Sequence, residues 1–280
     1  MNLVTELQHL VFVVLAFVLM WIAKKVFDLR AASVLKADYE IEEQSNLAVG
    51  IQRAGLYVAV PLALYSLITG PSTGDFLTDL MWFSLYGVIL IMLLMIAAII
   101  NDKLIVTQID NTEALKSGNI AVGLVEAGSL IATGLIAQGS FSGEGGGVLE
   151  GLVFFCLGQV ALISLSWVYH WIMPYNLLSE IRKGNSAAGL MLGGLLVALG
   201  IILSRSISGD FNGWVNGLTG FGFGAVKGLV VLAVLTWVID GFFLPDTDLK
   251  TEIERDRNTA ALAMTAGIYI ALSLVIAAII

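Results

Sequence analysis

Eight apolar runs constrain this chain more than any other feature of its sequence. Each is about 20 residues long, the length of α-helix that crosses the roughly 30 Å hydrocarbon core of a bilayer. In lipid every backbone polar group needs a partner within the protein, so such runs are helices or barrel strands, and these are too long and too apolar for strands. The sequence therefore predicts an all-α, polytopic membrane protein with eight transmembrane helices, at about residues 6–27, 46–69, 79–100, 119–138, 148–171, 185–204, 215–240 and 259–280.

Composition and cysteine content exclude several other classes of protein. Of the 280 residues 58% are hydrophobic and 13% charged, whereas soluble domains carry about a quarter charged residues. The opening "MNLVTELQHL" has no basic residue, unlike a secretory signal, so we expect the first run to be retained as a helix. The single Cys156 excludes a disulfide framework within one chain. A net charge of −8 without a basic block argues against nucleic acid as a partner.

Basic residues concentrate in the connections on one side of the predicted bundle. The opposite connections hold only Arg205, and Arg53 and Lys227 lie inside spans. Since cytoplasmic connections are enriched in Lys and Arg, we predict that these connections lie in the cytoplasm and that both termini face outward. The residues behind this orientation follow the first, third, fifth and seventh runs: Lys24, Lys25, Arg30, Lys36, Lys103, Lys116, Arg182, Lys183, Lys250, Arg255 and Arg257.

A ten-residue motif opens every second run: "NLAVGIQRAG", "NIAVGLVEAG", "NSAAGLMLGG" and "NTAALAMTAG". Its asparagines are spaced by 73, 66 and 73 residues, which indicates a two-helix hairpin that was doubled twice. All hairpins enter from the same side, so the repeats are parallel, unlike the inverted repeats of many transporters. We expect two four-helix copies, at 1–139 (hairpins 1–70 and 79–139) and 147–280 (hairpins 147–205 and 214–280). The motif asparagines are Asn46, Asn119, Asn185 and Asn258.

These asparagines are typical N-caps, since a short polar side chain can bond the free N–H groups of a helix start; a direct ligand role is the alternative. Small residues recur at the fourth and eighth positions after most of them. Such residues let helix backbones approach, which drives packing in lipid. We therefore expect this side of each motif helix to face the bundle.

Arg53 and Glu126 occupy the same repeat position, seven residues and about 10 Å beyond their asparagines. An unpaired charge in mid-bilayer costs about 2.5 to 3.5 kcal/mol, so we predict that the two approach each other and that exchanging the charges would rescue the single reversals. They form either a structural ion pair or part of a polar pathway. Lys227 is the third pathway candidate. It lies on the same stripe as a predicted glycine zipper (Gly220, Gly224 and Gly228) in "GLTGFGFGAVKG", although it could instead reach a carboxylate or the outer surface.

A second position recurs near the end of each odd-numbered run, and polar or charged residues occupy it: Lys24, Asp102, His170 and Asp240. These residues could form a ring at the cytoplasmic mouth, or simply end their helices at the interface, where Trp and polar groups are common. The sequence contains no HExxH, P-loop or CxxC motif, and its two histidines are predicted on opposite sides of the membrane. We expect no enzyme activity, no catalytic residues, no metal site and no cofactor.

The arrangement Glu-Ile…Asn-x-Ala-x₆-Gly on a two-helix hairpin resembles the YjfL-like family of bacterial inner-membrane proteins, catalogued as domain of unknown function three-fifty. The resemblance covers almost the whole chain as two tandem copies. It implies a multi-pass protein of the bacterial cytoplasmic (inner) membrane, so that both termini would lie on the periplasmic side. It also implies gene neighbours that include PspA-type coat proteins and polyamine- or ATP-grasp-type enzymes, but no established activity. Arg53, Glu126 and Leu262 depart from the usual pattern.

Two hypotheses of function follow. The first is a channel or transporter for a small cation (a proton, a metal cation or a polyamine) through a polar bundle interior, because ionisable residues inside a membrane are usually functional. The second is a membrane scaffold or anchor that recruits soluble membrane-remodelling or polyamine-related partners to segments such as "TEIERDRN". The lipid bilayer is the expected environment in both cases, and the small-residue stripes would also allow homo-oligomers.

Overall fold

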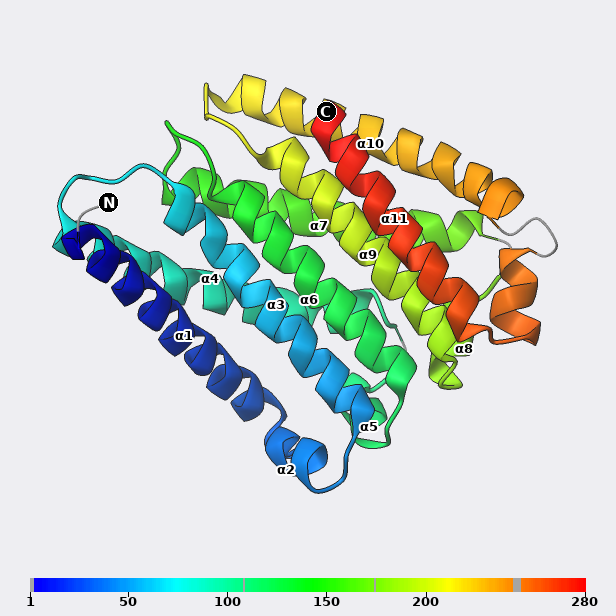
Figure 1. Cartoon of the computed structure of the whole chain (residues 1–280). Coiled ribbons are helices and arrows are strands. Elements are labelled where there is room, and N and C mark those ends of the chain that lie inside the picture. Colours follow the sequence, from blue (N-terminus) through cyan, green and yellow to red (C-terminus); the bar gives the residue numbers. More distant parts are fainter. Residues whose placement is uncertain (1–2, 108, 174, 244–247) are drawn as a thin grey trace.

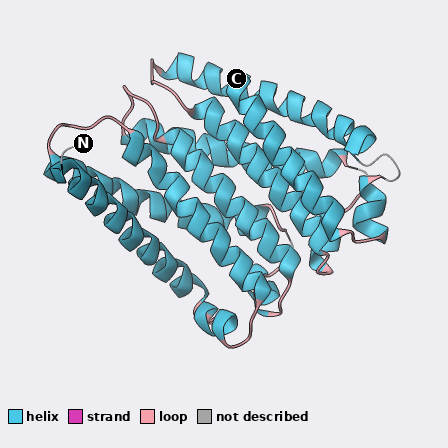
Figure 2. Ribbon diagram, in the orientation of Figure 1, coloured by secondary structure: helices cyan, strands magenta, loops and turns pink. Residues whose placement is uncertain are grey.

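The computed structural model describes residues 3–107, 109–173, 175–243 and 248–280, with side chains placed except at 3–6 and 235–243. The described residues contain no strand (Figure 2). Eight of their helices are long and apolar enough to cross a membrane, which confirms the predicted class. These are α1 (Leu3–Ala31), α3 (Leu47–Thr69), α4 (Phe76–Leu104), α6 (Ile120–Ser140), α7 (Val148–Ile172), α9 (Ser186–Ile207), α10 (Trp214–Phe243) and α11 (Thr259–Ile279).

Several helices are longer than their apolar runs. The run predicted at 6–27 becomes α1 over Leu3–Ala31, and the run at 79–100 becomes α4 over Phe76–Leu104. Hydropathy marks only the apolar part of a helix, whereas backbone hydrogen bonding continues into its polar ends. The added turns carry Asp28, Arg30 and Asp102, which belong to the charged cluster described below.

The four helices that follow the motif asparagines run parallel in one row, in the order α3, α6, α9, α11 (Figure 1). We call this layer the motif row. The other four helices form a second layer: α4 packs on α3 and α6, α7 on α6 and α9, α10 on α9 and α11, and α1 on α3 and α4. Each two-helix repeat therefore adds one helix to each layer.

Glycines bring neighbouring helices of the motif row into backbone contact. A Cβ on Gly123 would lie 2.5 Å from the Ala48 carbonyl oxygen, and a Cβ on Gly200 would lie 2.6 Å from the Ala132 Cα. Gly128 meets the Gly193 backbone even more closely. Helices in lipid associate mainly through such close packing, so the small residues of the motif stabilise the row.

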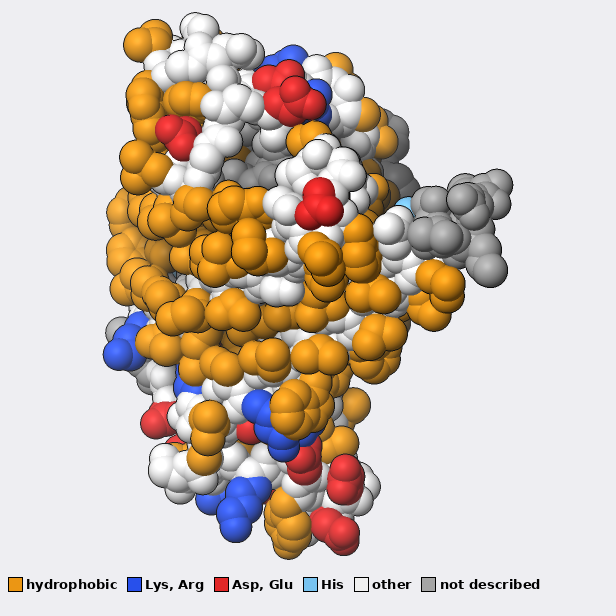
Figure 3. All heavy atoms as spheres, turned by 90° about the vertical axis from the view of Figure 1, so that its left-hand side faces the viewer, with side chains coloured by type: hydrophobic (Ala, Val, Ile, Leu, Met, Phe, Trp, Pro, Cys, Tyr) orange, Lys and Arg blue, Asp and Glu red, His pale blue; other side chains and the backbone are white. Residues whose placement is uncertain are grey.

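Short helices precede each motif at one end of the bundle: α2 (Ala37–Glu42), α5 (Asn111–Lys116), α8 (Leu177–Arg182) and a π-helical turn, η1 (Thr251–Arg255). We call this end the asparagine face. Both termini lie at the other end, the termini face (Figure 1). Figure 3 views the side on which α1 lies and shows hydrophobic side chains between charged side chains at the two ends. This band is the surface that lipid would cover. Exposed hydrophobic residues of α1 include Val13, Phe17 and Trp21.

All four motif asparagines are N-caps. Asn46 Oδ1 accepts from the Ala48 and Val49 amides, and the asparagines of the other three repeats cap in the same way. The residue before each asparagine has a positive φ; it is glycine before Asn119 and Asn185. The chain thus turns sharply out of each short helix and into the membrane-spanning helix.

Candidate functional site

Arg53 and Glu126 are both buried in the bundle, with only 3% and 6% of their surfaces exposed. They lie on neighbouring helices of the motif row, α3 and α6. Their side chains therefore face protein rather than lipid, as predicted. The same expectation is wrong for the small residues beside Arg53, because Ala54 is exposed and a Cβ on Gly50 would meet nothing within 4 Å.

The two charges do not bond each other; each has a different partner. Arg53 Nη2 donates to Asp28 Oδ1 at 2.8 Å, and Gln52 Nε2 donates to Glu126 Oε2 at 2.8 Å. The expected direct pair is replaced because α1 packs on α3 and supplies a carboxylate to the guanidinium. Arg30 and Arg53 nevertheless remain within electrostatic reach of Glu126.

Further ion pairs connect Arg53 to the asparagine face. Lys24 Nζ donates to Asp28 at 3.1 Å and to Asp38 at 2.6 Å. The Asp38 side chain is 56% exposed, and the Lys24 ammonium holds the pKa of this carboxyl below its usual value. Polar side chains are therefore linked from the bundle surface to the interior. We call the following set the charged cluster: Lys24, Asp28, Arg30, Asp38, Gln52, Arg53, Asp102 and Glu126, in which Arg30 also pairs with Asp102.

Polar residues continue beyond Glu126 along one side of α6. Ser129 and Thr133 lie three and seven residues after it, which places all three on one helical face. Asn101 Nδ2, from α4, donates to Ser129 Oγ at 3.1 Å and to Thr133 Oγ1 at 3.3 Å. It also donates at 3.3 Å to Gln159 Oε1 from α7. We call Ser129, Thr133, Asn101 and Gln159 the polar stripe; all four are buried.

Several buried polar atoms on this route have no hydrogen-bond partner among the described residues. Buried polar groups in proteins are almost always bonded, and each unsatisfied one costs about 1 to 3 kcal/mol. Five of the ten such side-chain atoms in the described residues lie on this route. The atoms are Gln52 Oε1, Arg53 Nε, Arg53 Nη1, Asn101 Oδ1 and Gln159 Nε2.

An apolar turn of α6 closes the polar stripe. Ile136 is fully buried, and a Cβ on Gly158 of α7 would lie 2.5 Å from its Cγ2 atom. One turn further on, Ser140 lines a cavity of about 390 Å³ on the termini face, together with Glu144, Glu150 and Asp210. Helix α6 thus carries polar groups on both sides of a single apolar layer.

The position of Lys227 corrects its predicted place in the buried pathway. The side chain is exposed, and Nζ lies 3.5 Å from the Ile279 carbonyl oxygen at the end of α11. Gly224 and Gly228 contact α9, whereas Gly220 has open space beside it. A lysine next to the packed face, rather than on it, can extend along the surface toward polar groups.

The four mouth candidates separate in the structure. Lys24 and Asp102 belong to the charged cluster. His170 instead lines a different cavity, of about 470 Å³, with Trp167 and Arg182. The Asp240 side chain lies outside the described residues. The ends of α1 and α4 therefore contribute to one site, while α7 contributes to another.

The motif asparagines also connect successive repeats. The Nδ2 atoms of Asn46, Asn119 and Asn185 donate to the carbonyls of Leu115, Ile181 and Ile253, respectively, in the short helix of the next repeat. In each case the cap of one motif helix is bonded to the segment that begins the next. The short helices are thereby held against the row.

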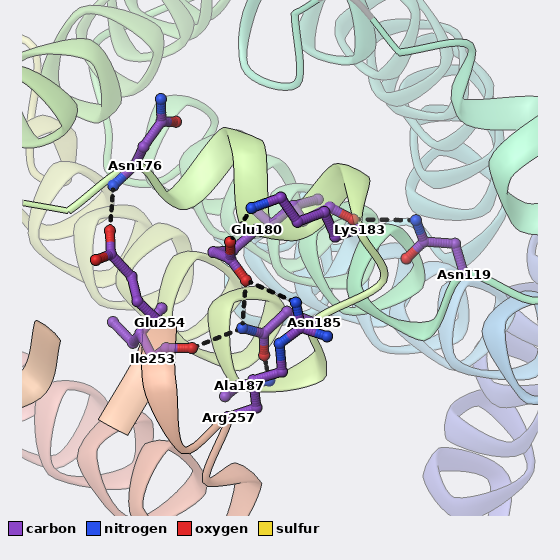
Figure 4. Close-up of polar contacts among 10 residues, drawn as sticks. Asn119, Asn176, Glu180, Lys183, Asn185, Ala187, Ile253, Glu254 and Arg257 are labelled. Carbon is purple, nitrogen blue, oxygen red and sulfur yellow. Dashed lines mark hydrogen bonds and ion pairs between the residues drawn. The ribbon is translucent and has the colours of Figure 1, made fainter. Parts of the chain in front are cut away.

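Glu180 reinforces the link between the last two repeats (Figure 4). It accepts from Lys183, Asn185 and Arg257. Burial raises the pKa of its carboxyl, but these three donors outweigh that effect and leave the pKa below its usual value. Glu180 is therefore ionised at neutral pH and joins α8 to the segment before α11.

Sequence reasoning missed Asp28, Gln52 and the polar stripe. Asp28 was hidden because it lies past the apolar run of α1. The stripe did leave a signal, since Asn101 and Gln159 are amide side chains inside or at the end of apolar runs, and Ser129 and Thr133 share the helical face of Glu126. None of these patterns indicates which helices pack against each other.

The fold and the buried polar network together define a polytopic α-helical membrane protein built from parallel two-helix repeats. The chain belongs to the family described as Domain of Unknown Function (DUF350), which matches it twice, at residues 2–141 and 145–280. The predicted resemblance, including the tandem copies, is confirmed.

Two curated relatives are membrane proteins of bacteria. A "UPF0719 transmembrane protein" of Aquifex aeolicus (strain VF5) is 24% identical, over 89% of this chain and 92% of the relative. The "UPF0719 transmembrane protein YshE" of Bacillus subtilis (strain 168) is 28% identical, over 47% of this chain and 92% of the relative. No solved structure matches.

Proposed function

We propose that this protein conducts a small cation, in the first place a proton, along helix α6 between the asparagine face and the cavity on the termini face. The observation that carries the proposal is the line of Glu126, Ser129, Thr133 and Ser140 on one side of α6, interrupted at Ile136. Ionisable and polar groups inside a membrane are costly and usually mark ion or proton pathways.

The charged cluster supplies the entry to this route. Its carboxylates outnumber its cations by one, because Asp28, Asp38, Asp102 and Glu126 face only Lys24, Arg30 and Arg53. Such a balance favours a cation over an anion. Asp28 neutralises the Arg53 guanidinium, so that this charge does not oppose a cation approaching Glu126.

Glu126 carries the cation in this proposal. Its carboxylate can accept a proton from the cluster side and release it toward Ser129 and Thr133, whose hydroxyls both donate and accept hydrogen bonds. Ile136 against Gly158 is the closed barrier, and movement of α7 relative to α6 opens it. The acidic cavity beyond concentrates cations at the far end. The proposal assigns no enzymatic reaction to the protein.

The excess of Lys and Arg near the asparagine face supports placing that face in the cytoplasm. The termini and the acidic cavity would then lie on the periplasmic side of a bacterial inner membrane.

Flux measurements on purified protein in liposomes test the proposal. We expect proton flux under an imposed potential, measured with an enclosed pH-sensitive dye, and its loss in Glu126→Gln. The matched control is Glu43→Gln, an exposed residue outside the charged cluster, which should retain the flux. Potassium and polyamine gradients are run in parallel to identify the cation. Equal flux from wild type and Glu126→Gln, or from wild type and empty liposomes for every cation, would contradict the proposal.

A membrane scaffold is the second candidate. It is favoured by the short helices of the asparagine face, which present exposed charges at Glu42, Glu43, Glu254 and Arg255. Those charges are available to a soluble partner, including the membrane-remodelling or polyamine-related proteins that the family resemblance suggests. A protein silent for every cation in the liposome assay, but retaining such a partner through these charges, would support this function instead.

A further inference from the structure

The first and last helices of the motif row each have an open face, and the equivalent faces of the other helices are buried in the junctions between neighbours. Each junction joins two faces. The leading face holds the residues 2, 9 and 13 positions after the asparagine of one helix. The trailing face holds the residues 4, 8 and 15 positions after the asparagine of the next.

The first two junctions use these positions throughout. In the first, α3 presents Ala48, Gly55 and Ala59 to Gly123, Ala127 and Gly134 of α6. In the second, α6 presents Ala121, Gly128 and Ala132 to Gly189, Gly193 and Gly200 of α9. At the third junction, Gly194 of α9 contacts Ala266 of α11. The same geometry thus recurs along the row.

The last helix repeats the leading face without a neighbour. Its residues are Ala260, Gly267 and Ala271, and all three are exposed, whereas Ala48 and Ala121 at the equivalent position are fully buried. A Cβ on Gly267 would meet nothing within 4 Å. Helix α11 therefore presents an unoccupied copy of the face that receives the next helix elsewhere in the row.

The first helix repeats the trailing face in the same way. Its residues are Gly50, Ala54 and Pro61, of which Ala54 and Pro61 are exposed. A Cβ on Gly50 would also meet nothing within 4 Å, although its equivalent Gly123 touches the Ala48 backbone. The face that packs on a preceding helix in α6 and α9 is therefore open in α3.

Polar and apolar groups at the asparagine face show the same incomplete pattern. Ile41 of α2 is 37% exposed, while its equivalents Leu115, Ile181 and Ile253 are 2%, 0% and 0% exposed. Those three residues provide the carbonyls bonded by the preceding asparagines. Asn258 is exposed, and its Nδ2 atom has no such bond among the described residues. The donor Asn258 therefore lies at one end of the row, and Ile41, the equivalent of the acceptor residues, lies at the other.

We propose that copies of this chain associate head to tail, with α11 of one copy packing on α3 of the next and extending the motif row. The occupant is a second copy because the two open faces are the two halves of a junction that the chain already forms internally. In this contact Asn258 donates to the Ile41 carbonyl of the neighbouring copy. Two different faces meet, so the contact is heterologous and generates a ring or an open ribbon.

The extent of the Bacillus relative is consistent with this contact. About half of this chain spans 92% of that relative. A chain with a single four-helix copy can form the equivalent of the α6–α9 junction only between two molecules.

Cysteine cross-linking in membranes tests the proposal. With Cys156→Ser as background, Arg257→Cys and Glu42→Cys are expressed together on differently tagged chains. Within one chain, Ser45 is the repeat equivalent of Arg257, and Lys116 is the equivalent of Glu42. These two residues adjoin Asn46 and Leu115, which are hydrogen-bonded. Ser45→Cys with Lys116→Cys in one chain is therefore the positive control. A membrane-permeant bismaleimide should join the two chain types into a mixed dimer and join neither type to itself.

A bulky residue on the open face provides the second test. Adding Ala260→Phe to the Arg257→Cys chain should abolish the mixed dimer, because this side chain fills the leading face of α11. Val160→Phe, on an exposed position of α7, is the matched control and should leave the dimer intact. The proposal is overturned by cross-links of one variant to itself, by a mixed dimer that survives Ala260→Phe, or by no mixed dimer when the internal pair reacts.

Discussion

Arg53 is held inside the bundle by a carboxylate from another helix. Its guanidinium is 2.8 Å from Asp28, and Nε and Nη1 have no other partner in the described part of the chain. Removing one member of a buried ion pair leaves the other charge uncompensated, which costs about 3 to 5 kcal/mol. Gln52, by contrast, offers Glu126 a neutral amide. The ion pair with Asp28 therefore fixes Arg53, and none of the described cations is directly bonded to Glu126.

This difference predicts which charge exchange the protein tolerates. Arg53→Asp alone should lower stability by about 3 kcal/mol, and adding Asp28→Arg should recover a large part of the loss because the pair re-forms with reversed sign. Exchanging Arg53 with Glu126 should bring no such recovery. Thermal unfolding of the purified single and double variants in detergent measures the loss of stability and its recovery for each exchange. Recovery with Glu126 but not with Asp28 would contradict the assignment.

At the scale of elements, each motif helix starts with an asparagine that caps it, and the first three asparagines also bond the next short helix. Asn185 is nine-tenths buried or more, bonds Ala187 through Oδ1 and donates to the Ile253 carbonyl at 2.7 Å. Asn258 caps α11 in the same way but lies at the open end of the row. Among the described residues, three of the four asparagines therefore have both roles, and Asn258 has the cap alone.

The two positions make a matched comparison. Asn258→Ala should cost about 1 kcal/mol for the lost cap. Asn185→Ala should cost about 1 to 2 kcal/mol more, since it also leaves buried groups near Glu180 without their donor. Unfolding of detergent-solubilised monomers gives both values. Equal losses would mean that the asparagine does not link neighbouring repeats.

At the scale of the whole molecule, stability rests on backbone contact along the motif row. Gly128 and Gly267 occupy the same repeat position, yet Gly128 touches the Gly193 backbone while Gly267 faces open space. Overpacking a tight contact costs about 1 to 3 kcal/mol. Replacing glycine by alanine in an unobstructed helix instead gains up to about 1 kcal/mol.

In detergent, where copies of the chain are separated, Gly128→Ala should therefore lower the unfolding temperature, and Gly267→Ala should leave it unchanged or raise it. Circular dichroism on heating follows both variants. A similar loss at the two positions would show that the row is not held by the contact between α6 and α9.

Much of the architecture was predictable, because lipid allows few solutions. Apolar runs of sufficient length must be helices, and four copies of one motif entering from one side must be parallel. The asparagine caps and the burial of Arg53 also follow from local pattern. Asp28 and Lys227 show where prediction failed. Asp28 lies past the apolar run of α1, so hydropathy did not mark it. Lys227 lies within the glycine pattern, but its side chain is exposed and extends toward the Ile279 carbonyl, which the pattern does not identify.

The number of spans, their fourfold repetition and the sides on which small residues gather were determined by the sequence alone, since these depend on the length and periodicity of each segment. Only the tertiary structure decided that α1 supplies the partner of Arg53, that α4 and α7 complete a polar line along α6, and that α3 and α11 are left as open edges. Those outcomes depend on which helices become neighbours, and in lipid that choice is made by packing between helix surfaces.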